Sequence, residues 1–474
     1  MSIRNALAAL GAACLLIASP SGIGGMARAE AEAKAQVKAK THAVTLTLPQ
    51  AHAMARAAIQ QGRPQLAYAM SETLLAQDPR NGHGHFIRAM ALASVKEFGE
   101  ARKSARRAFR FSDTDLHRHE AANLAAQLAY ADDRFTLSQL WLRRAVHYAG
   151  DEVTRERSID AYRKVRVRNP LNFHLSFSLT PSDNVNNGSN SPYNLIDGVP
   201  AVGVLSPSAQ AISGVVARLD FSASYRLAQG EGYETRLRGR AYSRQVSLND
   251  PVPGISGSDL GSTSVELGVS HFLANRAAPG SYWRLDATAG RVWYGGDPLY
   301  NSYALGVTRH QKLGENLSLT LSGSVERQID QVAPLANATV TELSAGLSYG
   351  LSGGATLGGH LQYRDTENRI ANRNFDNWAG VVSFKPARPV GPAELLFTLG
   401  YGESSYDRYF VVGFPVPGGR QDSSVFGGVT ATFKDWSYMG FVPTVSVKSQ
   451  KSRSNVSRFE VEETSLSVGI RSEF

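Results

Sequence analysis

The sequence predicts a two-domain α + β fold, with an N-terminal α-helical repeat domain and a C-terminal transmembrane antiparallel β-barrel of about 14 strands. The first 170 residues are rich in Ala and Arg, whereas the chain from Leu171 onward is rich in Gly, Ser, Asn, Tyr and Val. The spacing of apolar residues also changes there, from a helical period to the alternation of strands. The expected domains are a signal peptide at 1–29, a linker at 30–48, a helical domain at 49–168 and the barrel at 171–474.

The two parts also differ in charge. Residues 30–170 contain 23 Lys and Arg against 15 Asp and Glu, a net charge of +8, whereas residues 171–474 contain 25 against 26. The positive charge therefore belongs to the helical part. It suits anionic lipid or an acidic protein partner, although a modest excess is also common without any partner.

The N-terminus has the pattern of a secretory signal peptide. Arg4 supplies the positive region, an apolar core runs from Ala6 to Ala18, and Ala27-Arg28-Ala29 fits a cleavage site. The one cysteine, Cys14, lies inside this segment; the alternative that it accepts lipid is disfavoured by Gly11, where an aliphatic residue is usual. Since no later run of eighteen apolar residues predicts a spanning helix, we expect a periplasmic, secreted or outer-membrane protein.

A helical repeat of 34 residues follows Pro49. Ala67 and Ala101 are 34 residues apart, as are Pro79 and Asp113, and a third cycle runs to Ala145. A helix-turn-helix period of this length, with small residues at the packing positions, is typical of tetratricopeptide (TPR) repeats. The repeat is degenerate, so a plain helical bundle remains the alternative.

One predicted helix has a basic face. Spacings of three and four residues bring its cations together, and the two interpretations are a solvated surface and a contact surface for an acidic client or lipid head groups. His83-Gly84-His85 and His117-Arg118-His119 suggest metal ligands, but residues two apart on a helix point in different directions, so we expect no metal. The basic face consists of Arg102, Lys103, Arg106, Arg107 and Arg110.

Strand-like alternation dominates the second part. From Leu317 to Glu326, for example, Leu and Val alternate with Ser, Thr and Glu. Each segment alone would also fit a soluble sandwich, but the series as a whole favours a barrel, which has to be closed because open edges in lipid leave amides unpaired. The strands are expected to begin near 172, 213, 232, 262, 282, 302, 317, 339, 355, 376, 393, 421, 438 and 458.

The connections between these strands alternate in length. The odd-numbered ones are mostly long and the even-numbered ones mostly short, as in outer-membrane barrels, where the short turns face the periplasm. An even number of strands returns the C-terminus to the side of the helical domain, so we expect that domain in the periplasm. The last strand alternates and finishes at Phe474, which resembles the signal read by the barrel assembly machinery.

Taken together, the signal peptide, the short TPR-like domain and the barrel resemble the surface lipoprotein assembly modifier (Slam) family. The first strand runs into an Asn-rich turn similar to a motif at the start of that family's barrel, and Gly440-Phe441-Val442-Pro443 with Ser454-Asn455 is similar to its last hairpin. The turn contributes the motif positions Asp183, Asn184, Val185 and Asn186.

The resemblance implies an outer-membrane translocator, which exports or displays a client protein taken from the periplasm. The client would be a surface lipoprotein or a secreted haem- or metal-acquisition protein. The helical domain is expected to meet the client or periplasmic chaperones, and the barrel, set in outer-membrane lipid, to provide the route. The helical domain is shorter than in better-known members, which leaves the type of client open.

Other functions fit the sequence less well. It contains no Gly-x-Ser-x-Gly elbow and no phosphate loop, so we expect no enzyme, no cofactor and no nucleic-acid partner. An exopolysaccharide export barrel also joins TPR repeats to a barrel, but usually with a longer array. A porin or nutrient channel is the other alternative, with an anion-selective wall formed by the inward residues Arg236, Arg238, Arg240 and Arg244.

Overall fold

The computed structural model describes residues 47–472, apart from the side chains at positions 48, 49, 52 and 201–203. The predicted signal peptide with Cys14, nearly all of the linker, and Phe474 lie outside these residues. The chain divides into two compact units, Met1–Val165 and Arg166–Phe474.

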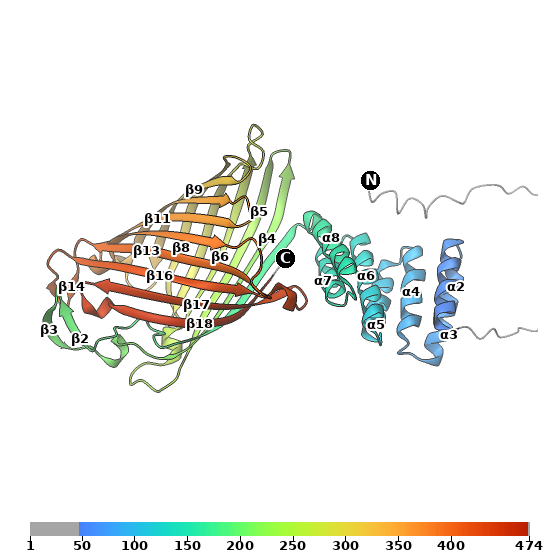
Figure 1. The fold of residues 1–474 in the computed structure, drawn as a ribbon, viewed down its shortest axis with the longest axis horizontal. Coiled ribbons are helices and arrows are strands. Elements are labelled where there is room, and N and C mark those ends of the chain that lie inside the picture. Colours follow the sequence, from blue (N-terminus) through green and yellow to red (C-terminus); the bar gives the residue numbers. More distant parts are fainter. Residues whose placement is uncertain (1–46, 473–474) are drawn as a thin grey trace, which may run out of the picture. The chain divides into compact units, whose positions relative to one another are not determined.

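The described part of the first unit is helical. Its helices form three successive antiparallel pairs, and a last helix runs on into the second unit (Figure 1). None of the helices in residues 47–472 is long and apolar enough to cross a membrane. The helices are α2 (Leu48–Gln60), α3 (Pro64–Gln77), α4 (Gly82–Ser94), α5 (Phe98–Arg110), α6 (Asp115–Ala131), α7 (Phe135–His147) and α8 (Glu152–Arg168).

Small residues hold these helices together. Ala67 and Ala101, the two alanines spaced one repeat apart, are both completely buried. The turn inside each pair contains one residue with positive φ: Gly62 at 72°, Lys96 at 64° and Asp133 at 54°. The predicted repeat of helix pairs is therefore present both in the packing and in the turns.

The second unit contains a closed antiparallel barrel of fourteen strands. Each begins within five residues of its predicted position. Two small hairpins lie in connecting loops and are not barrel strands: β2 (Tyr193–Ile196) with β3 (Val199–Val204), and β14 (Phe410–Val411) with β15 (Phe414–Pro415). The barrel strands are β1 (Leu171–Ser182), β4 (Gly214–Gly230), β5 (Tyr233–Leu248), β6 (Ser262–Ala274), β7 (Tyr282–Tyr294), β8 (Asp297–Lys312), β9 (Leu317–Asp330), β10 (Ala338–Gly350), β11 (Thr356–Asn368), β12 (Phe375–Lys385), β13 (Glu394–Tyr406), β16 (Arg420–Thr432), β17 (Phe441–Ser454) and β18 (Val461–Ser472).

Side chains on each strand alternate between the outside of the barrel and its lumen. On β8, Tyr303, Leu305 and Val307 are exposed on the outside. An exposed ring of apolar side chains around a barrel is what a bilayer requires. Eight aromatic residues near strand ends are expected at the head-group level. Trp293 among them is partly buried, and the other seven are exposed: Tyr225, Trp283, Tyr294, Trp378, Tyr401, Trp436 and Tyr438.

The connections differ between the two ends of the barrel. The end at which β1 finishes carries the long connections 183–213, 249–261 and 407–419, and it is called the loop end below. The other four connections at this end have two to seven residues: 295–296, 331–337, 369–374 and 455–460. At the other end β1 begins and β18 finishes, and the shortest connection there is 231–232. All three long connections lie at the predicted end, but the remaining loop-end connections are no longer than those at the opposite end, which have two to eight residues.

Candidate functional site

A groove of about 750 Å³ crosses the surface of the helical unit between α5 and α7. Four of the five residues of the predicted basic face line it, all on α5: Arg102, Lys103, Arg106 and Arg110. Arg118 of α6 and Arg144 of α7 add two further cations. We call this surface the basic groove.

The floor of the basic groove is apolar. Trp141 packs edge-on against Phe109, with ring centroids 5.3 Å apart, and the Arg144 guanidinium lies 4.5 Å from the centre of the Trp141 ring. Leu137 and Leu140 complete the lining, and Leu140 is exposed. The groove therefore offers an apolar surface inside a ring of positive charge.

Some cations of the groove already pair with carboxylates of the protein, and others do not. Arg102 is ion-paired with Asp132, Lys103 with Glu100 at 2.6 Å, and Arg118 with Asp115 at 2.9 Å. Within residues 47–472, no carboxylate forms an ion pair with the three remaining arginines. These are Arg106, Arg110 and Arg144, and they supply the net positive charge of the groove.

Some members of the predicted constellations lie elsewhere. Arg107 is exposed on α5 but does not line the basic groove. The rings of His83 and His117 pack edge to face, with their centroids 4.4 Å apart. The buried His85 and His119 form hydrogen bonds with backbone carbonyl oxygens. Among the described residues, no group of three or more His, Cys, Asp or Glu side chains could hold a metal ion.

The lumen wall along β5 carries balanced charge. Arg236 pairs with Glu234, Arg238 with Asp286 at 3.0 Å, and Arg240 with Asp220 at 2.6 Å. Each of these three arginines therefore has a carboxylate partner in the lumen. An anion-selective wall would need their charge to be unpaired.

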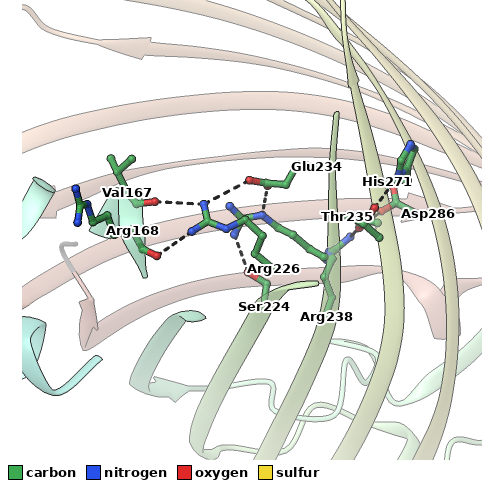
Figure 2. A network of polar contacts seen from close by, with 11 residues as sticks. Val167, Arg168, Ser224, Arg226, Glu234, Thr235, Arg238, His271 and Asp286 are labelled. Carbon is green, nitrogen blue, oxygen red and sulfur yellow. Dashed lines mark hydrogen bonds and ion pairs between the residues drawn. The ribbon is translucent and has the colours of Figure 1, made fainter. Parts of the chain in front are cut away.

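At the opposite end from the long loops, Arg226 of β4 caps the last turn of α8, within the barrel unit. Its guanidinium donates to the carbonyl oxygens of Val167 at 3.2 Å and Arg168 at 2.9 Å, and it lies 3.9 Å from Glu234 (Figure 2). The last carbonyl groups of a helix have no partner within the helix, and an arginine satisfies them well. The pair of Arg238 and Asp286 lies further along the same wall in Figure 2.

The motif at 183–186 forms the base of the first loop, at the loop end of β1. Asn184, which is buried, donates to the Gly188 carbonyl and accepts from its amide, both at 2.8 Å. Asn186 bridges to the far side of the loop, donating to the Gln210 carbonyl at 2.7 Å. Val185 packs into a small apolar cluster with Ile212, Val216 and Leu260, and Asp183 is exposed.

The first loop is also tied to the last one. The Ser457 hydroxyl donates to the Tyr193 carbonyl at 2.9 Å and accepts from the Leu195 amide at 2.7 Å. Ser457 lies in the connection between β17 and β18. The chain's first and last barrel loops thus form one folded layer at the loop end.

Comparison with known proteins identifies the class. The profile of the family described as surface lipoprotein assembly modifier matches residues 172–474, which covers the whole barrel apart from its first residue. The chain therefore belongs to the surface lipoprotein assembly modifier (Slam) family. Membership makes it an outer-membrane β-barrel protein that serves the assembly of lipoproteins at the cell surface. No curated protein matches the chain.

Solved structures resemble the two units only loosely. The type III secretion translocator chaperone SycD of Yersinia enterocolitica covers 26% of this chain and 85% of its own length, at 13% identity and a TM-score of 0.23. A BenF-like porin from Pseudomonas fluorescens covers 64% and 98%, at 11% identity and a TM-score of 0.35. OmpT of Vibrio cholerae matches 64% of this chain and 97% of its own length, at 12% identity and a TM-score of 0.32. These scores are too low to bear on function.

Proposed function

We propose that the chain translocates a client lipoprotein from the periplasm to the cell surface, with the helical unit capturing the client and the barrel providing the route. The observation that carries the proposal is the match of residues 172–474 to the Slam family, over a barrel that closes completely. Periplasmic chaperones and the barrel assembly machinery, through Phe474, are proposed partners. The client is proposed to be a lipoprotein rather than a soluble protein because of the family.

The topology supports a periplasmic position for the helical unit. The helices precede β1, and fourteen strands return β18 to the end at which β1 begins. The three long connections, 183–213, 249–261 and 407–419, all lie at the opposite end, and long loops face the outside in barrels of this kind. The long loops then lie outside the cell.

The basic groove is the proposed client-binding surface. Its three arginines without a carboxylate partner surround the apolar floor formed by Trp141 and Leu140. Charge-assisted hydrogen bonds to arginine and burial of the exposed Leu140 side chain would both contribute to binding. The client segment that fits is therefore acidic, with an apolar side chain among its carboxylates.

Reversal of charge in the groove tests this surface. The double substitution Arg106→Glu and Arg110→Glu should abolish display, because it replaces attraction for carboxylates by repulsion. Display is measured as the palmitate-labelled proteins that added protease removes from intact cells. Arg107→Glu is the matched control, since Arg107 is exposed on the same helix outside the groove. Equal display by the double variant and the control would disprove a role for the groove.

The translocator function itself is tested by deletion. Cells that lack the gene should lose one or more palmitate-labelled proteins from the protease-accessible set and regain them when the gene is restored. An unchanged set would reject the proposed function. Unchanged display together with lost polysaccharide secretion would favour the exopolysaccharide alternative.

A further inference from the structure

The seam at which the barrel closes, between β1 and β18, is joined by a short backbone ladder. On its other side β1 pairs with β4 along its entire length, from Leu171 to Ser182. Likewise β18 pairs with β17 from Val461 to Ser472. Across the seam, however, the ladder comprises only Ser176–Leu179 against Val468–Arg471.

Toward the loop end, side chains replace the backbone ladder. The Thr180 and Ser467 hydroxyl groups, next in register, bond to each other at 2.6 Å, and the Ser182 hydroxyl donates to Glu463 at 2.6 Å. Pro181, which lies between them on β1, has no backbone N–H to offer. Beyond Ser182 the chain turns into the folded motif at 183–186 and meets β18 again only at Asn190, which donates to the carbonyl oxygens of Glu460 and Glu462, both at 3.4 Å. The edge of β18 from Val461 to Ser467 therefore has no backbone ladder with β1.

The outward side chains place this unladdered stretch relative to the apolar band. On β18, Leu466, Val468 and Ile470 are exposed apolar residues, whereas the next outward positions toward the loop end are Thr464 and Glu462. The backbone ladder thus ends near the loop-side border of the apolar band. With the loops outside the cell, that border lies at the level of the outer leaflet.

Small side chains with hydroxyl groups line the lumen side of the seam. Ser178, Thr180 and Ser467 point inward with small side chains, and a Cβ on Gly469 would lie 2.4 Å from the Phe177 carbonyl oxygen. Toward the loop end the two strands are therefore joined by side-chain hydrogen bonds rather than by a backbone ladder. Every other wall of the barrel is held by longer ladders, such as β16 with β17 from Asp422 to Thr432.

We propose that the β1–β18 seam parts on the loop side of its backbone ladder when the bonds between the first and last loops are released, and that it lets the acyl chains of the client pass sideways from the lumen into the outer leaflet. The inference rests on the proposed function and adds to it the exit of the lipid anchor. The transfer of acyl chains from water into the bilayer is favourable, but a closed ladder of strands would block their way out of the lumen. The seam is the part of the wall whose opening breaks the fewest backbone hydrogen bonds.

A disulfide across the seam tests the exit. Thr180→Cys with Ser467→Cys places two thiols directly opposite each other, and the chain's single natural cysteine, Cys14, lies in the predicted signal peptide. Thr430→Cys with Ser446→Cys is the matched control: the same residue types, in register and 3.1 Å apart, across the fully laddered β16–β17 pair. Display of palmitate-labelled proteins is measured in oxidised and reduced cells.

Oxidation of the seam pair should reduce display to the level of cells without the protein, and a reductant should restore it, while the control pair displays normally in both states. Normal display with the seam locked would overturn the lateral exit and leave the proposed function standing. If instead the wild-type chain displays no lipoprotein, the proposed function fails on its own account. The two failures are therefore distinct.

Amide hydrogen exchange on the wild-type protein in detergent micelles gives a second measurement, which does not depend on the cysteine variants folding. The amides of Val461–Ser467 that face β1 should exchange about tenfold faster than those of β17, because no backbone ladder protects them. Equal protection of the two segments would contradict a seam that opens from the loop end.

Discussion

Arg244 on β5 ties the base of the first loop to the connection between β5 and β6. Its guanidinium donates to the carbonyl oxygens of Val185 and Leu260, each at 2.5 Å. Replacement by Met should therefore destabilise the loop by about 2–3 kcal/mol, the usual scale for losing hydrogen bonds from a charged donor.

The readout for Arg244→Met is cleavage of loop 183–213 by protease added to intact cells, which should rise markedly. Arg240→Met is the control, because Arg240 lies on the same strand and pairs with Asp220 in the lumen rather than with the loop. If both variants resist protease as the wild type does, Arg244 does not order the loop.

At the scale of elements, the turn between α4 and α5 has a strained backbone at Lys96, whereas the corresponding turn between α2 and α3 has a glycine. Lys96 adopts φ of 64°, a left-handed conformation that costs an L-residue about 1–2 kcal/mol. The corresponding turn between α2 and α3 uses Gly62. Lys96→Gly should therefore stabilise the helical unit by about 1 kcal/mol after the entropy of glycine is deducted.

The measurement for Lys96→Gly is the thermal transition of the helical circular dichroism signal in the full-length protein. Gly62→Ala provides the opposite change and should lower the transition. A lower transition for Lys96→Gly would show that the Lys96 side chain contributes more than the backbone strain costs.

The barrel strands were predictable from sequence because lipid and lumen impose opposite demands on successive residues. The two loop hairpins, β2 with β3 and β14 with β15, were not predictable. They lie in loops outside the bilayer, where no alternation of apolar and polar residues is imposed. The short ladder at the seam was equally hidden, since pairing between the first and last strands is a property of closure.

The site was predictable only in part. Helical spacing grouped five cations on α5, but it could not separate Arg107, which lies outside the basic groove, from the others. Trp141 and Arg144 reach the groove from α7 through the packing of one helix pair on the next, which no local pattern encodes. An indole followed three residues later by Arg on a helix was the one available signal.

At the scale of the whole molecule, the two units should unfold separately. The helical unit packs mainly through alanines such as Ala67 and Ala101, and small side chains bury little apolar area. The barrel is closed, and its strands have backbone partners on both sides. In detergent, helical dichroism should therefore melt at about 45–65 °C, the range of ordinary domains. Over that range the barrel should keep the compact form that resists SDS in electrophoresis.

Mild acid should lower the melting temperature of the helical unit but not that of the barrel. Burial lowers the pKa of His83 and His85 below 6.5, with the nearby His117 adding to the effect on His83. The unfolded helices therefore bind more protons than the folded ones, so stability falls as the pH drops through about 6.5. The helical transition should occur at a lower temperature at pH 5.5 than at pH 7.5, and His83→Gln should reduce the difference. A shift of the same size in the barrel's heat-induced mobility change would mean that the two units unfold as one.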